Sequence, residues 1–201
     1  SRGTLGLFLG SVLAQDQQRI PTERRGGQAR ERELAIEAAS ASEMDAWDKI
    51  LRMSGIEKKG EEALKYLEKY PAGAYVPYVH GILAMYYQEK KDEDRFVEHA
   101  ELAVSSLSDE VNLLAALSVT YAERQQPDPA IKYGKTALAM LPTKAAPEGM
   151  APAKWEEIRS KLTADAHYGT GTGYLFKAYN LGGADHLMTP ALKHLQEATR
   201  L

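Results

Sequence analysis

The sequence predicts an all-α protein: an array of antiparallel helical hairpins with one inserted loop and helix. The chain of 201 residues contains 29 alanines and no long run of β-branched residues, which favours helices over strands. Apolar residues between 79 and 141 recur at three- and four-residue spacing, the pattern of helices with one buried face. The pattern of one helix pair then returns in the next pair after a constant interval.

Equivalent positions in the two pairs lie 34 apart in the sequence. They are Leu83 and Leu117, Ala84 and Ser118, Tyr87 and Tyr121, Phe96 and Ala130, Ala103 and Ala137, and Ser108 and Pro142. Small residues return where two helices must cross closely, and larger ones return where the gap between helices must be filled. A constant interval of this length between helical hairpins is typical of solenoid repeats.

These residues resemble the tetratricopeptide-repeat (TPR) family. The second pair reproduces the family pattern completely, with Leu117-Ser118, Tyr121, Ala130, Ala137 and Pro142 at the expected spacing. The first pair matches in part, because Phe96 and Ser108 replace an alanine and the proline. The resemblance covers roughly residues 40–201. It implies three to four hairpins in a right-handed array, and a role in protein–protein interaction.

We expect the repeat domain to span residues 31–201, with hairpins at about 40–71, 76–107, 110–141 and 166–201 and the inserted loop and helix at 142–165. Asp128 and Thr189 are predicted to cap helices that begin at Pro129 and Pro190. These two starts are further apart in the sequence than one repeat allows, which is why an insertion is predicted. In the last hairpin Tyr179 and Ala191 are taken as the repeat pair, with residues 185–188 lengthening the turn.

The first residues predict export. Arg2 precedes an apolar stretch, and Val12-Leu13-Ala14 supplies a small-residue cleavage site, so residues 1–14 are interpreted as the remnant of a secretory signal peptide. A short buried N-terminal helix is the alternative. Residues 15–30 are polar and glycine-containing, and are expected to form a flexible tether. The predicted location is the bacterial periplasm or the secreted fraction, with no membrane insertion after cleavage.

Composition excludes several kinds of chemistry. Twenty-five basic and 28 acidic residues leave a net charge of -3, which argues against a nucleic-acid partner. The chain has no cysteine, so disulfides, thiolate catalysis and cysteine-liganded metals are excluded. No nucleophile motif or paired-carboxylate site is recognisable, and we expect neither enzymatic activity nor a cofactor. The sequence does not indicate the oligomeric state.

Histidine offers little evidence for a metal site. The five histidines are His80, His99, His167, His186 and His194, and no two of them are four residues apart. His80 and His99 can approach each other across one hairpin, but adjacent helices bring many such pairs together by chance. We therefore expect hydrogen-bonded histidines and no metal ligands.

The resemblance implies where a partner would bind. In the family, the non-packing positions of the first helix of each hairpin line a concave groove. The matching residues here are Tyr78, Gly81, Met85, Gln88, Asn112, Ala115, Val119, Ala122, Thr170, Gly173, Lys177 and Asn180. This lining is mostly small or uncharged, so the expected partner is an apolar peptide segment or a partner helix. The alternative is a groove filled by the chain's own tether or final helix.

A second hypothesis is a small-ligand-binding or sensor domain. It would use a pocket between the inserted helix, with Trp155, and the run of Gly169, Gly171 and Gly173. The run lacks the lysine and the preceding strand of a phosphate loop. Each glycine costs a helix about 1 kcal/mol relative to alanine, so the run is expected to weaken or break its helix. The preferred explanation for the glycines is close packing between helices or a hinge.

Overall fold

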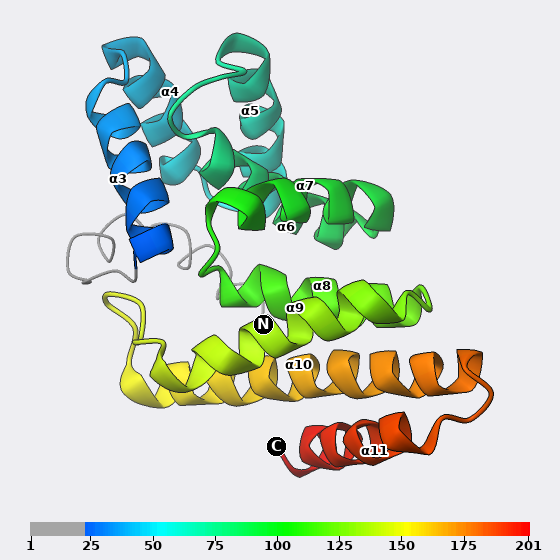
Figure 1. The fold of residues 1–201 in the computed structure, drawn as a ribbon. Helices are drawn as coiled ribbons and strands as arrows, with labels where there is room; N and C mark the ends of the chain where they lie inside the picture. Colours follow the sequence, from blue (N-terminus) through cyan, green and yellow to red (C-terminus); the bar gives the residue numbers. More distant parts are fainter. Residues whose placement is uncertain (1–22) are drawn as a thin grey trace. The chain divides into compact units, whose positions relative to one another are not determined.

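The computed structural model describes residues 23–201, with side chains from Arg30 onward. In this part of the chain all regular structure is helical: nine α-helices and one short 3-10 helix, with neighbours in sequence packed as hairpins (Figure 1). The predicted all-α hairpin fold is confirmed. The chain divides into two compact units, residues 1–108 and residues 109–201.

The first unit contains two hairpins preceded by one helix. Its helices are α3 (Glu23–Glu37), α4 (Ala41–Arg52), α5 (Ile56–Lys69), α6 (Val76–Lys90) and α7 (Glu93–Ser106). The α4–α5 and α6–α7 pairs occupy the hairpins expected at 40–71 and 76–107. Helix α6 packs against both α5 and α7. The apolar core includes Trp47, Ile50, Ile82, Leu83 and Phe96, all at most 2% exposed.

The predicted tether is partly wrong. Helix α3 begins at Glu23, so residues 23–30 are helical where a flexible segment was expected. Arginine, glutamate, glutamine and alanine are good helix formers, and they outweigh the Gly26-Gly27 pair. The predicted signal-peptide remnant, residues 1–14, lies outside the described residues.

The second unit also contains two hairpins. Its helices are α8 (Val111–Glu123), α9 (Pro127–Met140), α10 (Pro152–Asn180) and α11 (Asp185–Arg200), with a 3-10 turn at Leu141–Thr143. Helix α10 packs against α8, α9 and α11. Lys144 fixes the loop before α10, because its ammonium pairs with Asp109 at 2.7 Å and its carbonyl accepts from Trp155 Nε1 at 3.2 Å.

The turns of the two central hairpins repeat at the same interval as the sequence. Lys91 and Gln125 are separated by one repeat interval, and both adopt left-handed backbone conformations, with φ of 59° and 55°. The amide that follows each one returns to the first helix: Asp92 N donates to Tyr87 O at 3.0 Å, and Gln126 N donates to Tyr121 O at 2.9 Å. The repeat predicted from side chains is therefore also a repeat of backbone hydrogen bonds.

Both predicted proline starts are wrong. Helix α9 begins at Pro127, two residues early, and Asp128 makes an ion pair with Lys177 instead of a cap. Helix α11 begins at Asp185 and carries Pro190 inside it. Leu187 and Met188 are half-buried, so the helix extends upstream to pack them even though Pro190 cannot donate a helical hydrogen bond.

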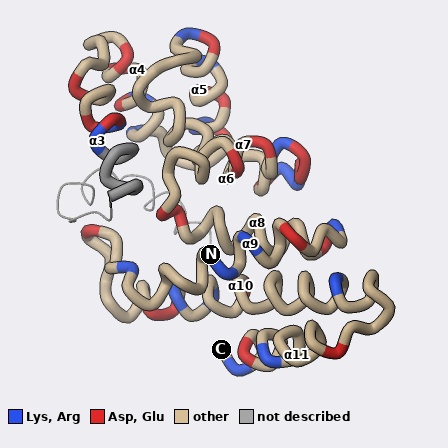
Figure 2. The backbone as a smooth tube through the Cα atoms, in the orientation of Figure 1, with Lys and Arg blue, Asp and Glu red and all other residues tan. Residues whose placement is uncertain are grey.

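The predicted break between the inserted helix and the last hairpin is also absent. Helix α10 runs without interruption from Pro152 to Asn180, through the whole glycine run. The segment expected as an insertion, 142–165, therefore supplies a loop and the first half of this helix. Acidic and basic residues are interspersed along the described helices (Figure 2). None of these helices is long and apolar enough to cross a membrane.

Candidate functional site: the α10 face and the histidine pairs

The glycines of α10 are contact points between helices. An added Cβ at Gly169 would lie 2.1 Å from Ser118 Oγ and 2.6 Å from its backbone carbon, on α8. At Gly173 it would meet Ile131 and the Pro127 carbonyl of α9 at 2.9 and 3.1 Å. The close packing of these glycines offsets their low helix propensity, and this explains why α10 stays continuous.

Helix α9 packs against the same crossing of α8 and α10 through Gly134. A Cβ at Gly134 would lie 2.1 Å from Thr170 Oγ1 and 2.5 Å from Ser118 Oγ. Both hydroxyls are buried and satisfied, because Ser118 donates to the Ala130 carbonyl at 2.8 Å and Thr170 donates to the Ala166 carbonyl at 2.7 Å. Three helices thus approach one another through small residues whose polar atoms are all paired.

The third glycine fixes the register of the last hairpin. A Cβ at Gly171 would lie 3.1 Å from the Ala191 carbonyl, the same carbonyl position that Ser118 contacts at Ala130 in the preceding hairpin. Gly171 therefore corresponds to Ser118. It follows that Tyr174, and not Tyr179, corresponds to Tyr121, and that Ala191 corresponds to Ala130.

In this register the last hairpin is longer by eight residues, since Tyr174 and Ala191 are 17 apart where Tyr121 and Ala130 are nine apart. Gly182, with φ of 74°, takes the turn position that Lys91 has in the α6–α7 hairpin, and Gly183 N donates to the Ala178 carbonyl at 2.9 Å. Four extra residues precede Gly182 and four follow it. Each helix is thus longer by about one turn, so residues before and after the tip keep their facing directions.

One face of α10 carries exposed apolar side chains. Tyr168, Leu175 and Tyr179 are 41%, 38% and 81% exposed. They stand at i, i+7 and i+11, which a helix brings to within about 20° of one direction. We call these three residues the α10 stripe. In the corrected register, Tyr168 and Leu175 correspond to Ala115 and Ala122, two of the predicted groove positions on α8.

Several predicted groove residues are not accessible. Tyr78, Gly81, Ala115 and Ala122 are buried; Met85, Asn112, Val119 and Lys177 are half-buried; Gln88 and Asn180 are exposed. Lys177 Nζ pairs with Asp128 of α9 at 2.6 Å, so it points to the neighbouring hairpin. In the shifted register, Thr170, Gly173, Lys177 and Asn180 no longer correspond to the positions predicted on α8. The residues that do correspond to Asn112, Ala115, Val119 and Ala122 are Asp165, Tyr168, Thr172 and Leu175.

Tyr78 has a packing role that the repeat pattern does not assign. It is 1% exposed, and its ring lies 5.9 Å from that of Trp47, which in turn stacks on Tyr75 at 5.2 Å and 8°. This aromatic cluster joins α4 to the start of α6. Three aromatic rings in contact bury a large apolar area, and they account for part of the excess of tyrosine over phenylalanine.

The predicted pocket between Trp155 and the glycine run is not formed. Both lie on the single helix α10, where 16 residues separate Trp155 from Gly171, a distance of about 24 Å along the axis. Trp155 is buried, and the glycines are in contact with other helices. These residues cannot line one small-molecule pocket.

A hollow of about 500 Å³ lies elsewhere, in the first unit. It is lined by α3, the start of α4, the 72–74 turn and the ends of α6 and α7, including Glu31, Arg32, Glu43, Ser105 and Ser106. Glu43 is buried at its edge, where Oε1 accepts from the Tyr66 hydroxyl and the Ala74 amide, both at 2.6 Å. Burial, reinforced by this hydrogen bond, raises the pKa of Tyr66 well above its ordinary value.

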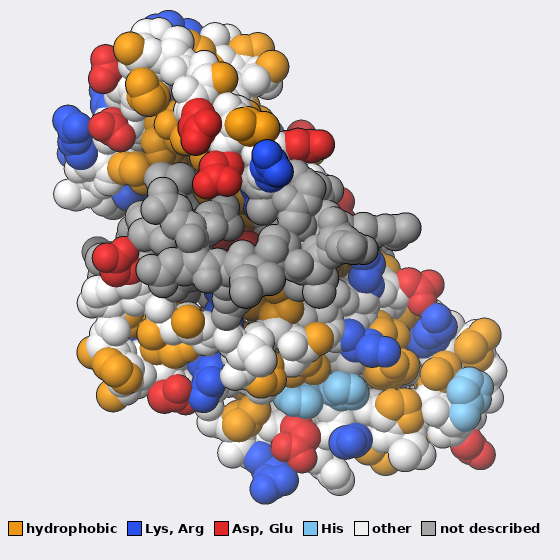
Figure 3. All heavy atoms as spheres, turned by 60° about the vertical axis from the view of Figure 1, so that its left-hand side comes forward, with side chains coloured by type: hydrophobic (Ala, Val, Ile, Leu, Met, Phe, Trp, Pro, Cys, Tyr) orange, Lys and Arg blue, Asp and Glu red, His pale blue; other side chains and the backbone are white. Residues whose placement is uncertain are grey.

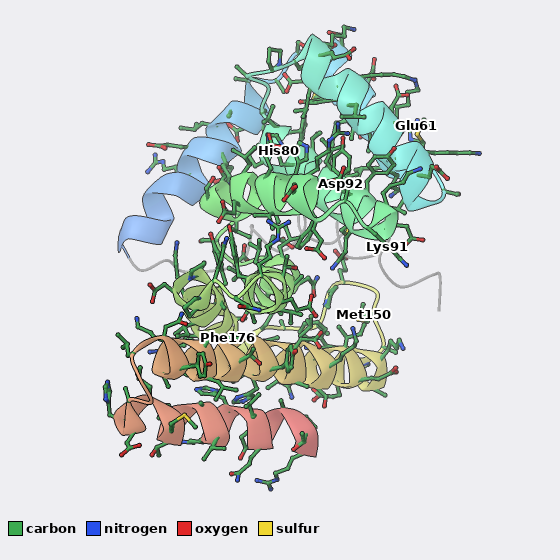
Figure 4. The ribbon with its side chains drawn as sticks, turned by 90° about the vertical axis from the view of Figure 1, so that its right-hand side faces the viewer. Glu61, His80, Lys91, Asp92, Met150 and Phe176 are labelled. Carbon is green, nitrogen blue, oxygen red and sulfur yellow. The ribbon has the colours of Figure 1, made fainter. Side chains whose placement is uncertain are left out.

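Four of the five histidines form two pairs. His80 on α6 lies 2.9 Å from His99 on α7, and His167 on α10 lies 2.8 Å from His194 on α11, in each case between Nδ1 atoms. All four are half-buried, and burial is the main cause that lowers the pKa of each imidazole. His80 is labelled in Figure 4. Sequence reasoning allowed for the first pair and missed the second, because the register of the last hairpin was misassigned.

Among the described residues, no group of three or more histidine, aspartate and glutamate side chains is placed to hold a metal ion. The described helices thus define an all-helical protein built from antiparallel hairpins, two of which repeat at one interval in both sequence and turn geometry. No protein-family model matches the sequence, and no curated protein matches it either.

Proposed function

We propose that the chain is an exported, non-enzymatic scaffold of the tetratricopeptide type that binds an apolar peptide segment or the apolar face of a partner helix. The observation that carries this proposal is the α10 stripe. Its residues Tyr168, Leu175 and Tyr179 are large, apolar-bodied and exposed on one line of a rigid helix. Exposed side chains of this kind gathered in one place are typical of interaction surfaces.

The chemistry of the stripe favours a helix or extended apolar segment as the partner. Tyrosine combines an apolar ring with a polar hydroxyl and is enriched in protein interfaces. An apolar partner helix matches residues spaced seven and then four positions apart, because its own apolar side chains recur at the same helical intervals. The glycine contacts on the other sides of α10 hold the stripe in place without help from the partner.

The test begins with a peptide selected from a random library against the full chain. We expect the selected peptide to be apolar, and its affinity to fall by about tenfold or more in a Tyr168→Ser, Leu175→Ser variant, since central interface anchors carry most of the binding energy. Leu192→Ser is the matched control, because Leu192 is also an exposed leucine of the same unit, at 54% against 38% for Leu175, and lies on α11. Isothermal titration calorimetry measures both.

Two results would contradict the proposal: a selected peptide that binds both variants as tightly as the parent, or a library that yields no binder. Loss of binding in the Leu192 variant alone would place the partner on α11. A peptide or small polar molecule whose binding depends on Glu43 would instead support the sensor hypothesis, relocated to the hollow of the first unit.

A further inference from the structure

The two histidine pairs are built on one plan. Each joins the first helix of a hairpin to the second through a hydrogen bond between Nδ1 atoms, 2.9 Å long in His80–His99 and 2.8 Å long in His167–His194. In each pair the second histidine also stacks on a tyrosine that lies seven residues after the first histidine. The corrected register makes the two sets equivalent residue by residue.

The hairpin between them shows that packing does not require histidine at these positions. In place of the two histidines it has Leu114 and Tyr133. Tyr133 stacks on Tyr121 at 5.8 Å and 12°, as His194 stacks on Tyr174 at 6.1 Å and 19°. An apolar residue and an aromatic ring are thus enough to fill the crossing, and the imidazoles add a property that this hairpin lacks.

A hydrogen bond between two Nδ1 atoms limits the charge that the pair can carry. One Nδ1 holds a proton and donates, so the other must present its lone pair and accept. A first proton from solution can enter at Nε2 of the donating ring, which keeps the bond and makes it charge-assisted. A second proton must occupy the accepting Nδ1. Two N–H groups then face each other, and repulsion between two imidazolium ions replaces the bond.

The charges around the second pair oppose protonation while α11 lies on α10. Glu197 on α11 favours a cation, whereas Lys193 on α11 and Lys135 on α9 both oppose it. Helix α8 carries one charged residue, Glu123, at its last position, and Asp165 on α10 is held in an ion pair. Burial is the main cause that lowers the pKa of both imidazoles. Both rings therefore take up protons more readily when α11 is away from α10.

Helix α11 is weakly held apart from this pair. Among the described helices it packs extensively against α10 alone, whereas α9 is held by both α8 and α10. Ala191 is the one residue of α11 that is fully buried, so few side chains anchor the helix. Histidine side chains reach the surface in Figure 3, and both rings of the second pair are half-buried, so protons from solution have access.

We propose that the His167–His194 pair is an acid-sensitive latch, which holds α11 on α10 while one ring is neutral and releases α11 when both rings are protonated. The histidine pKa is lower when α11 is docked, so the contribution of the latch is complete above the ordinary pKa of 6.5 and is lost as pH falls below it. Around the first pair, Glu98 and Arg95 balance, so it lacks this excess of positive charge. The latch does not depend on a partner at the α10 stripe.

The test measures hydrogen exchange of the full chain at about pH 7.5 and about pH 5, with each amide rate divided into the intrinsic rate at the same pH. We expect the protection of α11 to fall by about tenfold or more at the lower pH, and that of α9 to change much less. The double variant His167→Leu, His194→Tyr copies the middle hairpin and should keep α11 protected at both pH values. His186→Gln, at an exposed histidine outside both pairs, is the control and should behave as the parent does.

An equal acid response of α11 in the parent and the double variant would overturn the latch, as would an α11 that stays fully protected at about pH 5. A second measurement needs no variant and so remains valid if the double variant does not fold. Nitrogen-15 NMR of the histidine rings follows protonation in the parent, and uptake of the second proton by the pair should coincide with the loss of α11 protection. Two protonated rings beneath a protected α11 would refute the proposal.

Discussion

At the scale of single residues, the described structure depends on buried polar atoms that are hydrogen-bonded where small neighbours leave room for them. Glu43 is the clearest case in the first unit, because its buried Oε1 accepts two hydrogen bonds and Gly73 leaves the space for them. A Cβ at Gly73 would lie 2.5 Å from that oxygen. A buried carboxylate is tolerated only with such partners, so the residues around it constrain one another.

The hydrogen bond and burial of the Tyr66 hydroxyl predict how the free energy of unfolding changes at alkaline pH. Its pKa is raised in the folded protein, so its contribution is complete below the ordinary tyrosine value of 10.0 and is lost as pH rises above it. We expect Tyr66→Phe to cost about 1–3 kcal/mol near neutral pH, because the Glu43 carboxylate loses a donor. The difference from the parent should shrink above pH 10.

Urea denaturation of the parent and of Tyr66→Phe at several pH values checks this. Tyr179→Phe, at an exposed tyrosine, is the control and should leave stability unchanged. A difference between parent and Tyr66→Phe that stays constant from pH 7 to pH 11 would show that the hydroxyl is not held by Glu43.

The close contact of Gly169 with Ser118 predicts the effect of a substitution on the stability of the second unit. Alanine is the better helix former by about 1 kcal/mol, yet Gly169→Ala should destabilise the unit by about 1–3 kcal/mol, because its Cβ would overlap the backbone of Ser118. Thr172→Ala, three residues later on the same helix, should have little effect. Chemical denaturation measures both, and a stabilised Gly169→Ala protein would refute the close crossing.

At the scale of helices and hairpins, the sequence predicted most where local signals agree. Between Val76 and Met140 the apolar periodicity, the constant repeat interval and the turn positions all indicate the same hairpins, and the outer bounds of both hairpins follow within one residue. The start of α9 was misplaced because two prolines, Pro127 and Pro129, could each occupy the first helical turn. A preference for the first helical turn does not choose between them.

Helix α10 shows the limit of local reasoning. Three glycines in five residues indicate a weak helix, and only the contacts with α8, α9 and α11 reveal why it persists. The same missing information hid the register of the last hairpin, and with it the second histidine pair. The α10 stripe could not be selected either, because the misassigned register placed the groove positions elsewhere, on Lys177 and Asn180.

The continuity of α10 can be measured directly. We expect the backbone amides of residues 169–173 to be protected from hydrogen exchange as strongly as those in the middle of α9, because they lie inside an unbroken helix and against three others. Exchange followed by mass spectrometry or NMR provides the comparison. Fast exchange confined to the glycine run would mean that the segment acts as a hinge.

At the scale of the whole molecule, the chain separates into two compact units at Ser108. The sequence did not predict this boundary, since the repeat continues across it without change in side-chain pattern. Each unit contains one tryptophan, Trp47 or Trp155, and both are buried. The two residues therefore serve as separate reporters of the two units.

We expect the units to respond separately to a local change. With 5-fluorotryptophan incorporated, Gly169→Ala should lower the denaturation midpoint of the Trp155 resonance and leave the midpoint of the Trp47 resonance where it is. Tyr66→Phe should lower the midpoint of the Trp47 resonance and leave the midpoint of the Trp155 resonance where it is. Fluorine NMR during a urea titration follows both signals, and equal shifts of both midpoints would show that the chain unfolds as one cooperative unit.

The extra turn on each helix of the last hairpin has a practical consequence. Its tip, with Leu181 exposed and Gly182 and Gly183 at positive φ, projects about 6 Å beyond the length of the neighbouring hairpin. Added residues there would interrupt neither the glycine contacts nor the histidine pair. The tip is therefore the position of choice for an inserted affinity tag or fluorescent label, close to the α10 stripe and outside the packed helices.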